Sequence, residues 1–491
     1  MKCLNNRNVF WLVLGSAAVF AGAVSLYIGM QQSVWFDEAY SVLLAEHSWI
    51  DIVRLTAQDV HPPVYYGLLK VWMMVFGSSE LAIRSLSAVL FGLSVGVAGM
   101  VMRRLFGTRV ALTALPFVAF APFLLRYGFE IRMYALASLI GVTATYILLK
   151  AVETEERQKR FRYLAIYGLL VLAGVYTLYF MALIWIAHLT WLMILAAREK
   201  ERRTFLKQAV VTYACSFVLF LPWLPNVIRG AGGGTLSPVT HSLGPENLKG
   251  IVTYLFLYQP PWKVSLIFVI GIMLLVGAVA VFGYKQADKK ERRYVGLLAA
   301  YFVVPIAVLF VLTQFLPIYL ERYLAHFALG GYACLGVLTA LMLRQNKLRV
   351  RAIGGALCVV LIIGCISFVR FGNYNFQRIH TPSVKQVAAQ LSGCKAGAVI
   401  FADGPQIAME LNYYIKDCPV YFFNETLEMG GGFAMMSGSP LRVGSSSELP
   451  EAEELYHVYY DKPKNAVPSW FFEKDHTEIG AISITTYQSN R

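Results

Sequence analysis

The residues Asp59 and His61 stand before two prolines in the segment Asp59-Val60-His61-Pro62-Pro63. A residue before proline is pushed toward extended backbone geometry, in which positions i and i+2 point to the same side. The spacing therefore predicts a carboxylate–imidazole pair that is able to bind a divalent cation, grip a phosphate or relay a proton. The alternative is a Pro-Pro turn that carries a solvated histidine.

A second acidic pair, Asp37 and Glu38, follows a long apolar run in the segment Trp35-Phe36-Asp37-Glu38-Ala39-Tyr40-Ser41. On a helix, adjacent positions point about 100° apart, so the two carboxylates cannot share one task. Asp37 then shares a face with Tyr40, whereas Glu38 points elsewhere. Acidic side chains between aromatic rings at a membrane border are costly to keep without a use. The pair is a candidate functional site; the alternative is that both charges mark the end of a helix.

Arginines occur in two short segments between apolar runs, at residues 126–134 and 320–323. In the first segment Glu130 is four positions from both Arg126 and Tyr134, which would pair them on a helix. Arginine binds phosphate through two parallel hydrogen bonds, so both segments are candidate anion sites. The alternatives are a structural ion pair that closes a hairpin, and arginines that extend to lipid headgroups.

The composition indicates the class of protein in which these residues must be positioned. The chain has 491 residues, of which 57% are hydrophobic and 15% charged, and its mean hydropathy is +0.56. Soluble proteins carry about 25% charged residues, so a water-soluble enzyme and a disordered chain are both excluded. The net charge of +14 comes from short Lys/Arg clusters between apolar runs, which indicates membrane topology and no nucleic-acid partner.

The apolar runs predict a polytopic α-helical membrane protein with about eleven transmembrane helices. Five Lys/Arg-rich loops alternate along the chain and all fall on the side of the N-terminus, as the positive-inside rule requires. We therefore expect a multi-pass protein of the cytoplasmic (inner) membrane, with a cytoplasmic N-terminus and an extracytoplasmic C-terminus. The expected spans are residues 9–30, 81–102, 110–125, 133–149, 164–178, 180–197, 209–228, 264–284, 294–313, 324–343 and 352–369.

Three large segments are expected outside the membrane core: residues 31–80, the Gly- and Pro-rich residues 229–263, and the tail. The first outer loop, residues 31–80, contains an apolar stretch at 64–76 that is too short to span and is expected as an interfacial helix. Residues 371–491 are expected to form a small extracytoplasmic α/β domain, separate from the transmembrane domain at 1–370. Its predicted helices are residues 382–391 and 406–415, and its predicted strands are 396–401, 420–423, 455–460 and 479–487.

Cys394 and Cys418 are the two cysteines expected in this outer domain, where oxidation can occur. A disulfide bond between them and two free thiols both fit the sequence.

With this topology the acidic pair, the Asp/His pair and both arginine segments fall at one depth on the outer side. Convergent carboxylates and arginines at that surface suit a reaction on an anionic group carried by a lipid. These motifs resemble those of the GT-C superfamily of polyprenyl-phosphate-sugar-dependent glycosyltransferases. Within it they are similar to bacterial family 39-like enzymes, related to protein O-mannosyltransferases, aminoarabinose transferases and lipid A galacturonosyltransferases. The matching motifs are Asp37-Glu38-Ala39-Tyr40-Ser41, Asp59-x-His61-Pro62-Pro63-x-Tyr65-Tyr66, Phe76-Gly77-x-Ser79-Glu80-x-x-x-Arg84, Glu130-x-Arg132-x-Tyr134, Pro222-Trp223-Leu224-Pro225 and Arg322-Tyr323.

The resemblance implies an inverting transfer of a sugar from a polyprenyl-phosphate donor to an acceptor hydroxyl of a glycan, glycolipid or protein. It assigns Asp37 as the general base and a catalytic role to Glu38, Asp59 and His61. It requires no cofactor and leaves a divalent cation (Mg or Mn) at Asp59 and His61 as an option. The other expected site residues bind the donor phosphate (Arg132, Arg322 and Tyr323) or brace the site (Glu130, Tyr134 and Tyr40).

Two other classes of protein remain as alternatives. A secondary transporter would place charged or broken-helix sites at mid-membrane and show repeat symmetry, and neither is visible in this sequence. A non-catalytic membrane scaffold or lipid-binding protein, with the tail as a partner module, also fits the composition.

Overall fold

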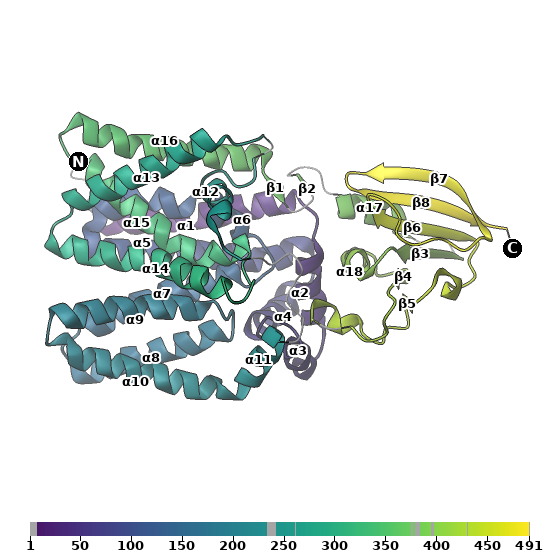
Figure 1. The fold of residues 1–491 in the computed structure, drawn as a ribbon, viewed down its shortest axis with the longest axis horizontal. Helices are drawn as coiled ribbons and strands as arrows, with labels where there is room; N and C mark the ends of the chain where they lie inside the picture. Colours follow the sequence, from purple (N-terminus) through teal and green to yellow (C-terminus); the bar gives the residue numbers. More distant parts are fainter. Residues whose placement is uncertain are drawn as a thin grey trace. The chain divides into compact units, whose positions relative to one another are not determined.

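The structure is a computed structural model that describes residues 7–232, 242–260, 262–374, 377–378, 383–393, 397–429 and 431–490. The chain forms two compact units (Figure 1). Unit 1 comprises Met1–Gly29, Arg84–Ile228 and Leu236–Gly372. Unit 2 comprises Met30–Ile83, Arg229–Thr235 and Asn373–Arg491. The first outer loop thus belongs to the same compact unit as the C-terminal tail, although the two are about 300 residues apart in sequence.

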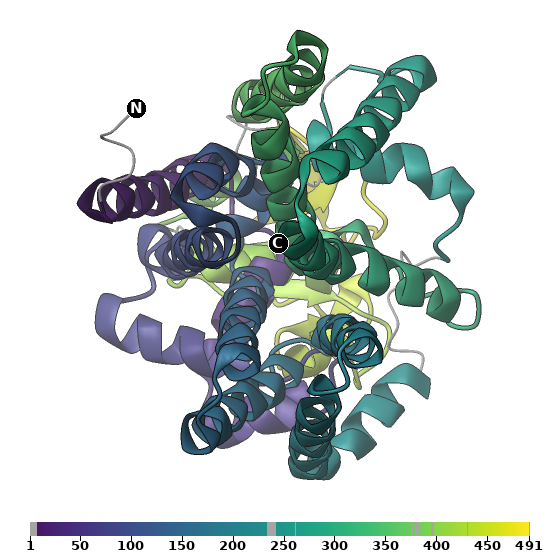
Figure 2. The same cartoon turned by 90° about the vertical axis from the view of Figure 1, so that its left-hand side faces the viewer.

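Unit 1 is a bundle of long helices, many of which are seen end-on in Figure 2. The long helices are α1 (Arg7–Met30), α5 (Glu80–Ala119), α7 (Tyr134–Glu153), α8 (Arg157–Val175), α9 (Met181–Arg198), α10 (Arg202–Phe220), α13 (Leu266–Gln286), α14 (Lys289–Thr313), α15 (Ala325–Leu343) and α16 (Leu348–Phe371). The short ones are α6 (Pro122–Gly128), η2 (Leu221–Trp223), α11 (Leu224–Gly232), η3 (Pro245–Asn247), α12 (Leu248–Phe256) and η4 (Glu321–Leu324).

Nine helices in the described part of the chain are long and apolar enough to cross a membrane, whereas the sequence predicts about eleven. One difference is α5, which holds two predicted spans in a single 40-residue element. Its backbone breaks at Gly107, where φ is 82° and ψ is 169°. The other is α8, whose first turns, Arg157-Gln158-Lys159-Arg160-Phe161-Arg162, are too charged to qualify. The polytopic helical architecture is confirmed. The number of spans depends on whether α5 is counted as one span or two and on whether α8 is counted as a span.

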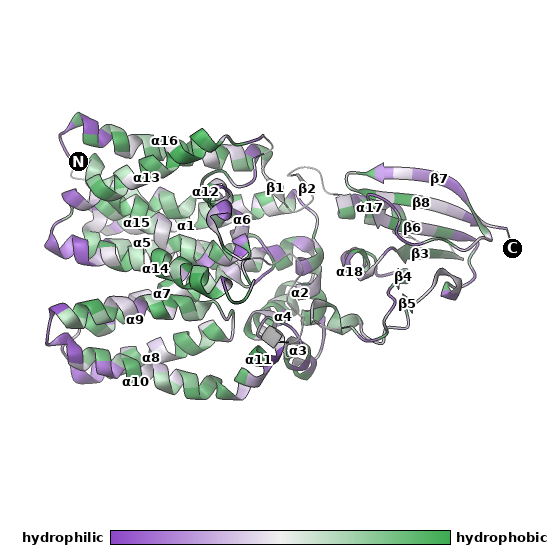
Figure 3. Ribbon diagram, viewed as in Figure 1, coloured by the Kyte–Doolittle hydropathy of each residue, from purple (hydrophilic) through white to green (hydrophobic). Residues whose placement is uncertain are grey.

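The five basic loops meet at one end of unit 1, where Figure 3 shows hydrophilic residues at the helix ends. A chain of polar contacts connects them. Arg104 pairs with Glu153 at the end of α7, and Arg202 donates to the Val152 carbonyl at 2.6 Å. Arg293 then pairs with Glu199 at 2.9 Å, and Arg344 with Glu291 at 3.0 Å. The start of α1 lies at the same end, because the Arg103 guanidinium is 4.3 Å from the Phe10 ring.

In unit 2 the first outer loop folds into α2 (Phe36–Glu46), α3 (Trp49–Thr56) and α4 (Val64–Phe76). The bounds of α4 are those predicted for the interfacial helix. The helix buries Tyr65, Tyr66 and Leu69 on one face and exposes Met74 and Val75 on another. This is the division that an amphipathic helix shows.

The tail is the predicted α/β module. Its elements are β1 (Asn373–Tyr374), β2 (Gln377–Arg378), α17 (Ser383–Leu391), β3 (Ala398–Ala402), α18 (Pro405–Tyr414), β4 (Val420–Phe423), η5 (Gly431–Met436), β5 (Arg442–Val443), η6 (Ser446–Glu448), β6 (Glu454–Tyr460), β7 (Phe471–Ile479) and β8 (Ile482–Ser489). Six strands form one sheet in the order β5-β4-β3-β6-β8-β7. The first four are mutually parallel, β8 pairs antiparallel with β6, and β7 pairs antiparallel with β8.

The central strand β3 reads Ala-Val-Ile-Phe-Ala, the continuous apolar run expected of a parallel strand covered on both faces. Phe401 of β3 packs with Leu455 of β6 and Phe471 of β7 in the apolar core of the domain. The sequence analysis does not predict β7. This strand pairs only with β8 at the sheet edge, and most of its residues, such as Glu473 and Lys474, are exposed, so it lacks the apolar pattern of a covered strand.

Cys418 in this domain is disulfide-bonded. Cys394, its expected partner, lies outside the described residues.

Replacing Gly107 by alanine should lower the stability of the bundle by about 1–3 kcal/mol, because its backbone conformation is one that essentially only glycine adopts. No atom lies within 4 Å of the added Cβ, so the effect would be purely conformational. The matched control is Gly271→Ala in α13, which also has open space and, in a helix interior, should leave stability unchanged or raise it by up to about 1 kcal/mol. Thermal unfolding of the detergent-purified protein measures both, and equal melting temperatures for the two variants would contradict this expectation.

Candidate active site

The first turn of α2 carries the acidic pair. Asp37 is partly buried and Glu38 is fully buried. The Glu38 carboxylate reaches back from the third helical position and accepts the Trp35 amide at 3.4 Å, as in one half of a capping box. The two carboxylates therefore do different things, as their adjacent positions predict. Glu38 satisfies a backbone group, and Asp37 is the one with an accessible side chain.

Tyr40, the predicted bracing residue of unit 2, lies one turn further along α2. Its ring meets the Tyr66 ring of α4 edge-on, with centroids 5.8 Å apart. Tyr66 in turn meets Tyr65 at the same distance. All three rings are buried, so they fix α2 against the helix that follows the Asp/His pair.

Asp59 and His61 form the predicted pair, with His61 Nδ1 3.3 Å from Asp59 Oδ2. Both side chains are buried, with exposed fractions of 6% and 7%, which excludes the alternative of a solvated histidine. The pair stands directly before α4, whose start is set by Pro62 and Pro63.

A divalent cation at this pair fits the structure poorly. The two side chains bind each other, whereas a metal site needs them to converge on a common point with further ligands. Within the described ranges, no group of three or more His, Cys, Asp and Glu side chains is arranged to hold a metal ion. We therefore derive no step that passes through a metal.

In unit 1, Arg126 and Glu130 form the predicted ion pair at 3.1 Å, and both are almost completely buried. The Arg126 guanidinium also lies over the Phe129 ring at 5.2 Å. The Glu130 carbonyl accepts a hydrogen bond from the Ser87 hydroxyl of α5 at 2.6 Å. These contacts fix the turn between α6 and α7.

The three donor-binding candidates gather around Tyr134 at the start of α7. The Tyr134 hydroxyl interacts electrostatically with Arg322, Arg132 and Tyr323. Tyr134 and Arg132 are buried, and Tyr323 is held by the Phe180 ring, whose centroid is 4.5 Å from its own. The Tyr134 hydroxyl is buried and has no hydrogen-bond partner among the described residues. The Glu130 carboxylate interacts with the same hydroxyl, so Tyr134 lies in the field of two guanidinium groups and one carboxylate.

Arg84 and Glu410 are buried charged residues that were not among the predicted site residues. Arg84 of α5, which the sequence analysis placed only in a motif, has its guanidinium 5.8 Å from the Phe129 ring. Glu410 of α18 accepts a hydrogen bond from the Phe36 amide at 2.8 Å. No local pattern could have indicated Glu410, because its partner is 374 positions away in the sequence.

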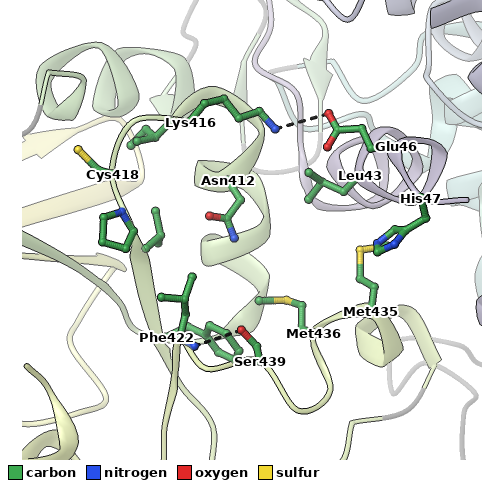
Figure 4. Close-up of a pocket in the computed structure, with 14 residues that line it drawn as sticks. Leu43, Glu46, His47, Asn412, Lys416, Cys418, Phe422, Met435, Met436 and Ser439 are labelled. Carbon is green, nitrogen blue, oxygen red and sulfur yellow. Dashed lines mark hydrogen bonds and ion pairs between the residues drawn. The ribbon is translucent and has the colours of Figure 1, made fainter. Parts of the chain in front are cut away.

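A cavity of about 470 Å³ lies at the other end of α2 (Figure 4). Leu43, Glu46 and His47 line it on one side, and Lys416 pairs with Glu46 at 3.5 Å on its rim. Met436 contributes from η5. None of the predicted site residues lines this cavity.

Comparison with known proteins gives a partial match to one family and a match in fold to solved structures. The dolichyl-phosphate-mannose-protein mannosyltransferase family matches residues 60–226, about a third of the chain, a range that includes His61, Arg132 and Tyr134. No curated protein matches the sequence.

Solved structures match over most of the chain. ArnT from Cupriavidus metallidurans, bound to undecaprenyl phosphate, has a TM-score of 0.62 at 13% identity over 98% of each chain. The archaeal oligosaccharyltransferase AglB from Archaeoglobus fulgidus, in complex with an inhibitory peptide and a dolichol-phosphate, has a TM-score of 0.52 at 12% identity, covering 91% of this chain and 69% of its own. The resemblance stated from the motifs is confirmed: this chain has the fold of the GT-C glycosyltransferases. It is a multi-pass membrane protein that combines this fold with a small C-terminal sheet domain.

Replacing Arg126 by alanine should destabilise the helical unit by about 3–5 kcal/mol, because it removes the cation from a buried carboxylate. Arg104→Ala is the matched control, since its partner Glu153 is about one-third exposed and the pair should contribute less than about 1 kcal/mol. Thermal unfolding in detergent compares the two variants. Equal stability of Arg126→Ala and the unmodified protein would show that Arg126 does not support the fold.

Proposed function

We propose that this protein is an inverting glycosyltransferase that moves a sugar from a polyprenyl-phosphate donor to an acceptor hydroxyl. The supporting observation is the cluster of Arg132, Arg322 and Tyr323 around a buried Tyr134 hydroxyl, in a chain with the GT-C fold. ArnT, which has the same fold, was solved bound to undecaprenyl phosphate. A phosphate on a long isoprenoid must be met at the bilayer surface, which gives a physical reason for the membrane architecture.

In the proposed reaction Asp37 accepts the proton of the acceptor hydroxyl as general base. The hydroxyl oxygen then forms a bond to the anomeric carbon while the bond from that carbon to the phosphate oxygen breaks. Polyprenyl phosphate leaves with the electron pair, and a single displacement of this kind inverts the anomeric configuration. Arg132 and Arg322 stabilise the negative charge that develops on the phosphate, and Tyr323 donates to it.

The other predicted site residues support this reaction. Asp59 and His61, as a buried pair, orient the acceptor or the phosphate. Glu38 holds the first turn of the helix that carries the base. Glu130 braces the site residues of unit 1 through its ion pair with Arg126. Tyr40 braces those of unit 2 through its ring contact with Tyr66.

We place the reaction at the outer face of the cytoplasmic membrane, with the N-terminus in the cytoplasm and the C-terminal domain outside. The support is the meeting of five basic loops at the end of unit 1 where α1 begins. The proposed partners are the lipid-linked donor, the bilayer, and a glycan, glycolipid or protein that offers the acceptor hydroxyl.

Asp37→Asn should lower the turnover number by about 10²–10⁴-fold, because a general base contributes an acceleration of that size. Binding of undecaprenyl phosphate should change less than threefold. The assay incubates the protein in nanodiscs with a panel of undecaprenyl-phosphate-linked hexoses and pentoses plus envelope extract, and measures release of undecaprenyl phosphate. Glu46→Gln, at the other end of the same helix, is the matched control and should keep full turnover. Full turnover in Asp37→Asn would exclude Asp37 as the base.

Arg322→Ala should weaken the binding of undecaprenyl phosphate by about 10–100-fold, since a hydrogen bond to a charged group contributes about 1.5–3 kcal/mol. Arg322→Lys keeps the charge without the paired hydrogen bonds, so its affinity for the lipid should lie between those of Arg322→Ala and the unmodified protein. Equilibrium binding of the radiolabelled lipid to nanodisc samples gives the affinities. A matching loss in Arg344→Ala, at the basic end of the bundle, would show that the effect is only one of net charge.

A further inference from the structure

The acidic end of α2 is held by the C-terminal domain. The Phe36 amide donates to Glu410 Oε1 of α18 at 2.8 Å. The Tyr460 hydroxyl at the end of β6 donates to the other carboxylate oxygen, Oε2. Glu410 is 3% exposed, so this carboxylate is committed to two donors from different parts of unit 2.

The contact between the Phe36 amide and Glu410 satisfies a backbone donor at the start of α2. The first amides of a helix have no partner within it and are usually satisfied by a side chain at the N-cap. Here the N-cap residue is Trp35, whose indole can only donate. Glu38 accepts the Trp35 amide, and Glu410 accepts the next one along. A carboxylate at this end also interacts favourably with the helix dipole.

Further contacts hold the turn that precedes α2. The Val34 amide donates to the Tyr414 hydroxyl of α18 at 2.7 Å. The Ser33 hydroxyl accepts the Lys385 amide of α17 at 3.1 Å. The Phe36 ring lies 5.0 Å from the Phe433 ring of η5. Residues from three elements of the C-terminal domain thus set where α2 begins.

Asp37 comes directly after the capped residue and interacts electrostatically with Glu410. The pKa of Glu410 is raised to about 7, mainly by burial and to a smaller extent by the charge of Asp37, while the hydrogen bonds from Tyr460 and Phe36 act to lower it. The carboxylates of Asp37 and Glu410 therefore influence each other electrostatically at the start of α2.

We propose that Glu410 is a positioning residue for the general base: by accepting the Phe36 amide it fixes the first turn of α2 and thereby the Asp37 carboxylate. This inference rests on the proposed function of Asp37. It makes the C-terminal domain a required part of the catalytic apparatus, since the residue that orients the base is located there.

The test compares Glu410→Ala, which removes both hydrogen bonds, with Glu410→Gln, whose amide can still accept from Phe36. Because small displacements of a catalytic group can cost about 10²-fold, Glu410→Ala should lower kcat by about 10–100-fold with KM for the donor within about threefold. Glu410→Gln should keep kcat within about threefold of the unmodified enzyme. In an Asp37→Asn background, Glu410→Ala should cause no further loss, because its effect passes through Asp37.

Lys416→Ala is the matched control. It breaks the pair with Glu46, which joins the same two parts of unit 2 at the opposite end of α2, and it should leave kcat unchanged. Hydrogen exchange gives a second readout that is independent of activity: the amides of residues 36–40 should exchange at least about tenfold faster in Glu410→Ala, and at the normal rate in Lys416→Ala.

The outcomes separate the two proposals. Normal turnover in Glu410→Ala with loss of turnover in Asp37→Asn overturns the positioning role alone, and equal losses in the Ala, Gln and Lys416 variants overturn it as well. Normal turnover in Asp37→Asn overturns the proposed function itself. If Glu410→Ala does not fold, Glu410→Leu, which fills the space but cannot accept from Phe36, takes its place; unchanged exchange at residues 36–40 and unchanged kcat in that variant would then count against the inference.

Discussion

A charged side chain cannot be kept in an apolar membrane interior without a partner, and this constraint organises the helical unit. At one end, Arg104, Arg293 and Arg344 pair with acidic residues of neighbouring helices. Elsewhere in the same unit, Arg126 and Glu130 pair out of contact with water. Arg132, Arg322 and the Glu130 carboxylate all interact electrostatically with the buried Tyr134 hydroxyl. Arg132 and Arg322 are the two arginines that we assign to the donor phosphate.

The local sequence pattern was sufficient to predict those elements whose burial depends on their own residues. The bounds of α4 and β4 are as predicted, because one is a short apolar helix between prolines and a glycine and the other an apolar strand. The predicted contact of Asp59 with His61 also forms, since the prolines that follow restrict the backbone. Each of these outcomes depends on residues that are close together in the sequence.

The features that the sequence did not predict depend on distant residues. The charged strand β7 is stable because β8 offers it a paired edge, and Glu410 caps a helix that begins 374 positions earlier. At Gly107, by contrast, the prediction of two spans agrees with the structure, because the helical backbone of α5 breaks there. ArnT shares the fold at only 13% identity. This is possible because helix packing tolerates the exchange of most apolar side chains.

The most direct test of the transferase proposal is mass spectrometry of the envelope glycans, glycolipids and glycoproteins of cells that lack this protein. The account predicts that one sugar disappears from one acceptor, that its polyprenyl-phosphate donor accumulates, and that the intact gene restores both. Identical profiles in cells with and without the protein, under conditions where it is expressed, would contradict the account.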